Sequence, residues 1–318
     1  MRGASAGPQQ RPARRVTGVV VGLSCLVLAA CGASGAHSAA DSSALAADRA
    51  TASASASASA TATVTPVAPR ALAAPTTGSR PTAVSKAATS PKSLSGNGSL
   101  AGKVIVIDPG HNGGNFTHPA QINRLVDAGF GQRKACNTTG TSTNARYTEA
   151  AYTFDVAERL AAVLRARGAK VVMTRTTNSG VGPCINQRAA IGNAAHADAV
   201  LSIHGDGSTA SGARGFHVII AQRMVGGSAV QRSSQRLGDD IRAAFRSGAG
   251  MPYSTYTGGG TAETHRSDIG GLNLSTRPAV MIETGNMRSA TDARLMSSAS
   301  WRQRAAAALA AGLARYLA

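Results

Sequence analysis

Three side chains that can bind a metal ion or transfer a proton occupy matching positions in the sequence. His111, His204 and Glu283 each follow, at once or after a short turn, a run of mostly apolar residues. A glycine stands within two residues after each of them. Imidazole and carboxylate groups are common ligands of catalytic zinc ions, and a carboxylate is a common general base. The repeated arrangement therefore predicts one hydrolytic metal centre.

The apolar runs before these side chains have the composition of buried β-strands. Residues 103–107, 199–203 and 278–282 are rich in Val, Ile and other apolar residues, which is typical of strands covered on both faces. Residues 148–167 carry apolar side chains at helical spacing, and a second strand is expected at 171–174, which makes a parallel strand–helix–strand unit. Because the carboxyl ends of parallel strands share one edge of the sheet, we expect the three side chains to meet there.

Other segments complete an α/β pattern. We expect a further strand at residues 215–220 and further helices at residues 185–195, 228–246 and 300–317. Residues 115–147 and 248–275 have no convincing periodic run and are expected to be loops. The sequence predicts a single α/β domain with a twisted, mostly parallel sheet, helices on both faces, and a zinc site at the carboxyl ends of the strands.

The residues before position 99 differ from the rest of the chain. Residues 1–31 contain an arginine-rich start, an apolar stretch and the sequence Leu-Ala-Ala-Cys, which predicts a signal peptide with a lipobox and lipidation of Cys31. Ordinary cleavage near Ala30, without a lipid, is the alternative. Residues 32–98 consist mainly of Ala, Ser, Thr and Pro, so we expect a disordered tether. Residues 99–318 are then the catalytic domain.

The chain is strongly basic, with a formal net charge of +18. No helix or stripe concentrates this charge, and aromatic residues make up only 3% of the chain, so nucleic-acid binding is not expected. A basic exported domain is suited to an anionic cell envelope. We expect an extracytoplasmic monomer, either held at the membrane through its N-terminal lipid alone or secreted into the cell wall.

Two cysteines lie in the expected domain. Cys136 and Cys184 both fall in loop-like regions. In an exported domain such a pair predicts a disulfide, although two separate free thiols are the alternative.

The two histidines supply only two of the three protein ligands that a catalytic zinc site requires. The candidates for the third ligand are Asp108, Glu149, Asp206 and Glu283. Glu149 also has a simpler explanation, because the helix dipole favours a carboxylate in the first turn of the helix at 148–167. The residues alone leave this choice open.

The domain resembles the zinc-dependent N-acetylmuramoyl-L-alanine amidases of the third, AmiC-like family. The matching residues are Ile107-Asp108-Pro109-Gly110-His111, Glu149, Thr174-Arg175, Arg188 with Asn193, Ser202-Ile203-His204 and Pro278-Ala279-Val280-Met281-Ile282-Glu283. The resemblance implies that His111, Glu149 and His204 bind Zn²⁺. It also implies that Glu283 is the catalytic carboxylate. The residues after His204 and Glu283 depart from the usual family pattern, but the family's mycobacterial branch is similar to this chain at both places.

The resemblance implies a peptidoglycan hydrolase that uses zinc-activated water to cleave the amide bond between N-acetylmuramic acid and L-alanine of the stem peptide. Arg175, Arg188 and Asn286 are candidate substrate-binding residues, and structural salt bridges are an equal alternative for the two arginines. Two other functions remain open. One is a non-catalytic wall-binding or regulatory module on the same fold, and the other is a zinc peptidase that trims stem peptides.

Overall fold

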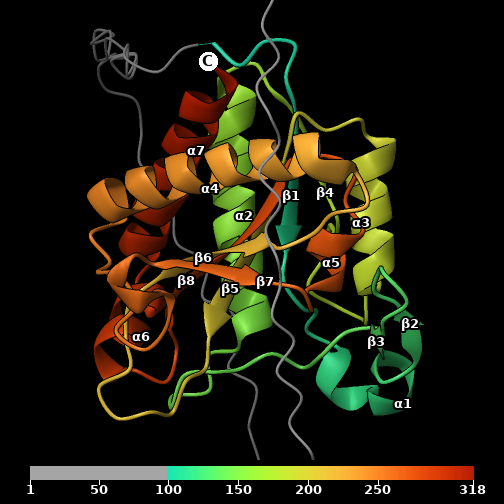
Figure 1. Cartoon of the computed structure of the whole chain (residues 1–318). Helices are drawn as coiled ribbons and strands as arrows, with labels where there is room; N and C mark the ends of the chain where they lie inside the picture. The colour runs from blue at the N-terminus through green and yellow to red at the C-terminus, as the bar shows by residue number, and fades with distance from the viewer. Residues whose placement is uncertain (1–98) are drawn as a thin grey trace, which may run out of the picture. The chain divides into compact units, whose positions relative to one another are not determined.

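The computed structural model describes residues 99–318, which form an α/β fold around a six-stranded sheet (Figure 1). The strands are β1 (Val104–Pro109), β4 (Lys170–Met173), β5 (Ala199–Asp206), β6 (His217–Ala221), β7 (Glu263–Arg266) and β8 (Ala279–Asn286). They lie in the order β4-β1-β5-β8-β6-β7. The first four run parallel to one another, whereas β6 is antiparallel to β8 and parallel to β7. The predicted α/β class with a mostly parallel sheet is confirmed.

Helices pack on both faces of the sheet. The long helices are α2 (Glu149–Ala166), α4 (Gly227–Ala249) and α7 (Ala299–Leu317), and they share one apolar core with strand residues such as Ile105 and Leu201. The intervening strand residues, such as Val106 and Val200, face a smaller cluster that includes α5 (Gly270–Asn273). The helix α3 (Ile185–Ala194) lies on this second side, where its Gly192 approaches Val200. Both faces are apolar because successive strand residues point to opposite sides.

The strands β1, β5 and β8 are neighbours, so their carboxyl ends lie at one edge of the sheet. Asp108 pairs with Ser202 in the register of β1 and β5, and His204 pairs with Glu283 in the register of β5 and β8. The amino end of α2 is held beside the end of β1, because the Thr153 hydroxyl donates to the Gly110 carbonyl oxygen at 2.8 Å. Thr148 caps this helix and accepts a hydrogen bond from the Ala151 amide.

Strands β1, β5 and β8 continue beyond the ends that the sequence indicated, and β1 continues from Ile107 to Pro109. We expected β5 and β8 to end at residues 203 and 282, directly before His204 and Glu283. Backbone pairing instead continues to Asp206 and Asn286, with an irregularity between His204 and Asp206. A glycine weakens a strand but does not end it where the backbone hydrogen bonds to the neighbouring strand continue beyond it. His204 and Glu283 therefore both lie within the sheet.

The expected loops contain short elements. Residues 115–147 include η1 (Asn115–Thr117), α1 (Pro119–Ile122) and a hairpin of β2 (Leu125–Asp127) with β3 (Arg133–Ala135). Residues 248–275 include η2 (Gly258–Gly260), β7 and α5, and the short helix α6 (Ala290–Ser297) was also not expected. These elements escaped detection because they are too short to show a period of apolar residues.

The expected disulfide between Cys136 and Cys184 is present. It joins the segment after β3 to the residue that precedes α3, and the two sulfur atoms are buried beside Val126. This small cluster fixes the hairpin of β2 and β3 to the start of α3. The alternative of two free thiols is therefore wrong.

The described residues contain no helix that is long and apolar enough to cross a membrane. The expected signal peptide at 1–31, lipidation of Cys31 and tether at 32–98 lie outside the described residues.

Candidate metal centre

His111, Glu149 and His204 converge at the carboxyl edge of the sheet. Glu149 Oε1 lies 3.1 Å from His111 Nε2 and 2.9 Å from His204 Nδ1. The two imidazole rings are nearly perpendicular, with centroids 4.9 Å apart. Within the described part of the chain, this is the one group of three such side chains whose ligand atoms all lie within 4.8 Å of one another. The other third-ligand candidates, Asp108, Asp206 and Glu283, do not belong to it.

Two of the three side chains, those of His111 and Glu149, are oriented by the backbone around them. His111 Nδ1 lies 3.0 Å from the Thr138 carbonyl oxygen, an arrangement that places the proton on Nδ1 and leaves the Nε2 lone pair directed toward Glu149. Glu149 Oε2 accepts from the Thr141 amide at 2.9 Å, and Oε1 accepts from the Gly205 amide at 3.1 Å. The carboxylate is therefore fixed from two sides.

Gly110, directly after β1, allows the backbone to approach the ring of His204 closely. A Cβ atom added at Gly110 would lie 2.3 Å from the ring of His204. His111 itself has a φ of 60°, which is uncommon for a residue with a side chain. The turn after β1 thus needs glycine at position 110, and it holds His111 in a left-handed backbone conformation.

The charges of the three groups support one another. Burial opposes ionisation of Glu149, but the neighbouring His111 and His204 outweigh it and hold the pKa of Glu149 well below its usual range. Burial alone would lower the pKa of His111, and the Glu149 carboxylate reverses this and raises it. An anion therefore persists between two imidazoles, as a cation site requires.

This donor set fits a zinc ion. Two imidazoles and one carboxylate are the ligands of one well-known class of catalytic zinc site, which leaves a fourth position open. Ligand atoms around tetrahedral zinc lie about 3.3 Å apart, given bond lengths near 2.0–2.1 Å. The separations of 2.9 and 3.1 Å around Glu149 Oε1 need little adjustment to reach that value.

Glu283 lies next to this group, on the neighbouring strand from His204. Its side chain is partly exposed, but the Oε2 atom is buried and has no hydrogen-bond partner among the described residues. Burial of the carboxyl group, reinforced by the charges of Glu149 and Asp206, raises the pKa of Glu283 well above its ordinary value. A carboxyl group of this kind suits proton transfer.

Arg188 and Arg175 are buried and use their donors within the chain. Arg188, 5% exposed, donates to Asp108 Oδ1, to the Pro109 carbonyl oxygen and to the His111 carbonyl oxygen. Arg175, 4% exposed, donates to the carbonyl oxygens of Pro109, Gly110 and Ala150. These contacts favour the structural alternative for both arginines.

Asn286 is also buried, and its side-chain amide donates to the carbonyl oxygens of Ser208 and Ala213. A contact of Asn286 with substrate stays a prediction.

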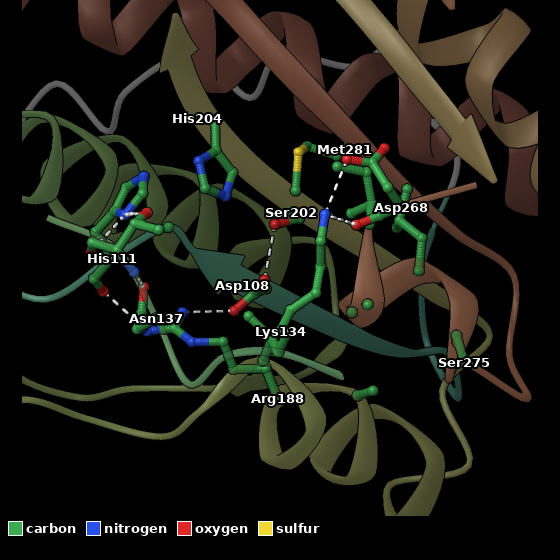
Figure 2. A pocket seen from close by; sticks show the side chains of 18 of the residues that line it. Asp108, His111, Lys134, Asn137, Arg188, Ser202, His204, Asp268, Ser275 and Met281 are labelled. Carbon is green, nitrogen blue, oxygen red and sulfur yellow. Dashed lines mark hydrogen bonds and ion pairs between the residues drawn. The ribbon is translucent and has the colours of Figure 1, made fainter. Parts of the chain in front are cut away.

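A cavity of about 310 Å³ opens beside the two histidines. In Figure 2 His204 and His111 lie at one side of it, and Asp108, Ser202 and Met281 follow along the sheet. Apolar side chains from α3, α5 and the sheet, including Ile185, Leu272 and Met281, form much of the wall. The group of three is thus reached from a preformed hollow rather than closed off in the core.

One neighbour of the site was not identified from the sequence. His217 is buried, 5% exposed, as the first residue of β6, and it pairs with Glu283 in the register of β6 and β8. Asp206 lies close by and accepts a hydrogen bond from the Tyr256 hydroxyl at 2.7 Å. The one local signal for the position of His217 was the turn at Gly215, two residues before it. The antiparallel pairing of β6 with β8 could not be predicted, because strand pairing leaves no pattern in the local sequence.

Residues 105–315 match the protein family described as N-acetylmuramoyl-L-alanine amidase. The chain belongs to this family, and the resemblance stated from the sequence motifs is confirmed.

Individual relatives are similar over the same region. An N-acetylmuramoyl-L-alanine amidase of Mycobacterium tuberculosis is 40% identical over 224 residues, which cover 69% of this chain and 88% of the relative. The crystal structure of the N-acetylmuramyl-L-alanine amidase Ami1 from Mycobacterium smegmatis matches with a TM-score of 0.65 and 38% identity, over 69% of this chain and 98% of that one. The apo form of Ami1 from Mycobacterium abscessus matches with a TM-score of 0.64 and 39% identity, over 69% of this chain and 100% of that one.

Proposed function

We propose that this protein is a zinc-dependent N-acetylmuramoyl-L-alanine amidase. It hydrolyses the amide bond between the lactyl group of N-acetylmuramic acid and the L-alanine of the peptidoglycan stem peptide. The observation that carries the proposal is the group of buried His111, buried Glu149 and partly exposed His204 beside Glu283, in a chain of this amidase family.

His111, Glu149 and His204 would hold the zinc ion. When bound, such an ion lowers the pKa of a coordinated water toward about 7 and polarises the scissile carbonyl group. The hydrogen bonds from Thr141 and Gly205 keep Glu149 in place for this task, and the Thr138 carbonyl oxygen sets the ring of His111.

Glu283 supplies the proton transfers. As a carboxylate it accepts a proton from the water that attacks the carbonyl carbon, and as a carboxylic acid it returns that proton to the departing amide nitrogen. The carbon–nitrogen bond breaks, and the products are a lactyl carboxylate on the sugar and a stem peptide with a free amino group on L-alanine. The raised pKa of Glu283 favours the second half of this cycle.

The test is a digestion of purified peptidoglycan with the purified protein, with and without a chelator, read by mass spectrometry. We expect stem peptides that begin with free L-alanine, and we expect the chelator to abolish them. Released D-alanine or opened cross-links would indicate the peptidase instead. No product from protein with a measured full zinc content would indicate the regulatory module.

An E283Q variant tests the proton transfers. It should bind zinc as the wild type does and lose most of its turnover. The matched control is E158Q, the same change at an exposed glutamate of α2, which should leave both properties unchanged. An E283Q variant with wild-type turnover would remove Glu283 from the mechanism.

The protein acts outside the cytoplasm, as its substrate requires, and we infer that Cys31 carries the lipid that holds it there. The motif at residues 28–31 supports this location. A C31A variant should move from the membrane fraction to the soluble extracytoplasmic fraction. If C31A and the wild type fractionate alike, plain secretion into the wall replaces the lipid anchor.

A further inference from the structure

A groove of about 430 Å³ lies between α6 and the loop that leads into α2, at the end of the molecule where α2 begins (Figure 1). One wall is a face of α6 that carries small side chains at helical spacing, namely Ala290, Ala293 and Ser297. Residues 143–145 of the loop form the opposite wall. No Asp or Glu among the described residues lines this groove, so its charge comes from the arginines that do.

Two arginines, Arg288 and Arg294, line the groove and are exposed. Neither is paired with a carboxylate among the described residues. Asp292 is the one acidic residue of α6, and it is buried. Its carboxylate accepts from the Gly215 amide at 2.6 Å and lies 3.2 Å from Arg214. The groove thus carries two positive charges that no carboxylate in this part of the chain neutralises.

The backbone at Arg288 is fixed although its side chain is exposed. Asn286 Oδ1 accepts a hydrogen bond from the Arg288 amide at 3.0 Å. The amide of the preceding residue, Met287, donates to the Asp206 carbonyl oxygen at 2.7 Å. The guanidinium group itself makes one long contact, in which Nη1 donates to the Ser142 carbonyl oxygen at 3.4 Å. Since a guanidinium group has five N–H donors, most of those of Arg288 are free for a ligand.

The groove begins close to the candidate metal centre. Ser142 follows Thr141, whose amide donates to Glu149 Oε2 at 2.9 Å. Through these two residues, the path from Arg288 Nη1 to Glu149 Oε2 is no longer than about 15 Å. An extended peptide advances about 3.3–3.6 Å per residue. The residues that follow the L-alanine of a stem peptide therefore reach Arg288 when that alanine lies at the metal centre.

We propose that Arg288 and Arg294 bind carboxylate groups of the stem peptide, and that they make the enzyme prefer stems with free carboxylates over stems whose carboxylates are amidated. This inference rests on the proposed amidase function. Guanidinium groups bind carboxylates through paired, charge-assisted hydrogen bonds, which a neutral carboxamide cannot reproduce. Arg175 and Arg188 are unsuited to this role, because their donors are used within the chain.

The test compares two soluble muropeptides of equal length, one with free stem carboxylates and one with these groups converted to carboxamides. The wild type should have the lower KM for the first. An exposed ion pair changes an equilibrium by up to about fivefold. R288Q/R294Q should therefore raise KM for the carboxylate substrate by about 5- to 25-fold. Its KM for the amidated substrate and its kcat for both should change by less than about twofold. The preference of the wild type should shrink as salt is added.

Two matched variants separate binding of a carboxylate from a general effect of charge. R288K/R294K keeps both charges and should stay within about threefold of the wild-type KM. R232Q/R304Q removes two exposed arginines from α4 and α7 and should leave both KM values unchanged. All these side chains are exposed, so the variants should melt at the wild-type temperature.

A binding measurement gives a readout that needs no turnover. Calorimetry with the full-length E283Q protein and the carboxylate muropeptide should give a Kd that rises by the same factor when R288Q and R294Q are added. The amidated muropeptide should bind the two proteins alike.

The outcomes distinguish the two proposals. If the wild type releases no stem peptide with a free L-alanine, the proposed function fails and this inference falls with it. If the wild type releases such peptides while R288Q/R294Q keeps the wild-type KM, the inference is overturned and the proposed function stands. An equal rise of KM for both muropeptides, or an equal rise in R232Q/R304Q, would also overturn it.

Discussion

Replacing Arg188 by methionine tests how the metal centre is held. The Arg188 guanidinium group donates to Asp108 Oδ1 at 2.8 Å and to the His111 carbonyl oxygen at 2.8 Å. Methionine has a similar length and no charge. R188M therefore leaves the carboxylate of Asp108 without its cation and the backbone of His111 without a donor.

The structure gives the size of the effect. Removing one partner of a buried ion pair costs about 3–5 kcal/mol. Burial would raise the pKa of Asp108, but Arg188 and the hydroxyls of Thr174 and Ser202 outweigh it and lower that pKa from 3.8 to about 2. This lowering corresponds to about 2.4 kcal/mol at about 1.36 kcal/mol per pH unit. We expect R188M to lose about 3 kcal/mol of unfolding free energy, or about 6–12 °C in Tm for a domain of this size.

The assay combines thermal unfolding of the zinc-free protein with a zinc titration. R188M should melt earlier and bind zinc more weakly, because its His111 loop is no longer held. The double variant D108N/R188M should lose less than the sum of the two single variants, since it leaves no lone buried charge. R304M, at an exposed arginine of α7, is the matched control. Unchanged Tm and zinc affinity in R188M, together with a raised KM, would refute this reasoning and make Arg188 a substrate-binding residue.

Three further results are expected. A C136S/C184S variant should lose about 4 kcal/mol of unfolding free energy, because the bond closes a loop with a sequence separation of 48, and an unchanged denaturant midpoint would contradict this. The lowered folded pKa of Asp108 stabilises the protein above pH 3.8, and that contribution is lost as the pH falls toward about 2, so the acid-induced loss of stability should be smaller in D108N than in the wild type. E149Q should weaken zinc binding by more than about 100-fold because the anionic ligand is lost, whereas wild-type affinity in E149Q would return the third-ligand role to Asp206 or Asp108.

The strands and the place of the site could be predicted from the sequence. The runs before His111, His204 and Glu283 are apolar on both faces, and the strand–helix–strand order makes the first pair of strands parallel. Those two facts are enough to bring three side chains to one edge. The choice of Glu149 over Asp108 needed the family resemblance, because a helix-start carboxylate and a strand-end carboxylate look alike in local sequence.

Other features of the site and fold could not be predicted, because they depend on contacts that leave no pattern in the local sequence. The buried Arg188 donates hydrogen bonds to backbone carbonyl oxygens, such as those of Pro109 and His111. Every residue has a backbone carbonyl group, so the sequence does not show which ones accept from Arg188. The pairing of His217 with Glu283 joins segments far apart in the chain. The hairpin of β2 and β3 is held by a disulfide more than by an apolar face, so periodicity could not reveal it.

The hydrogen bonds that set His111 and Glu149 all come from the chain itself. Thr138, Thr141, Gly205 and Arg188 hold these side chains and their backbone. Thr138 and Thr141 lie only three positions apart, and they contact His111 and Glu149 respectively. A change that shifts the segment 138–141 would therefore displace both candidate ligands together.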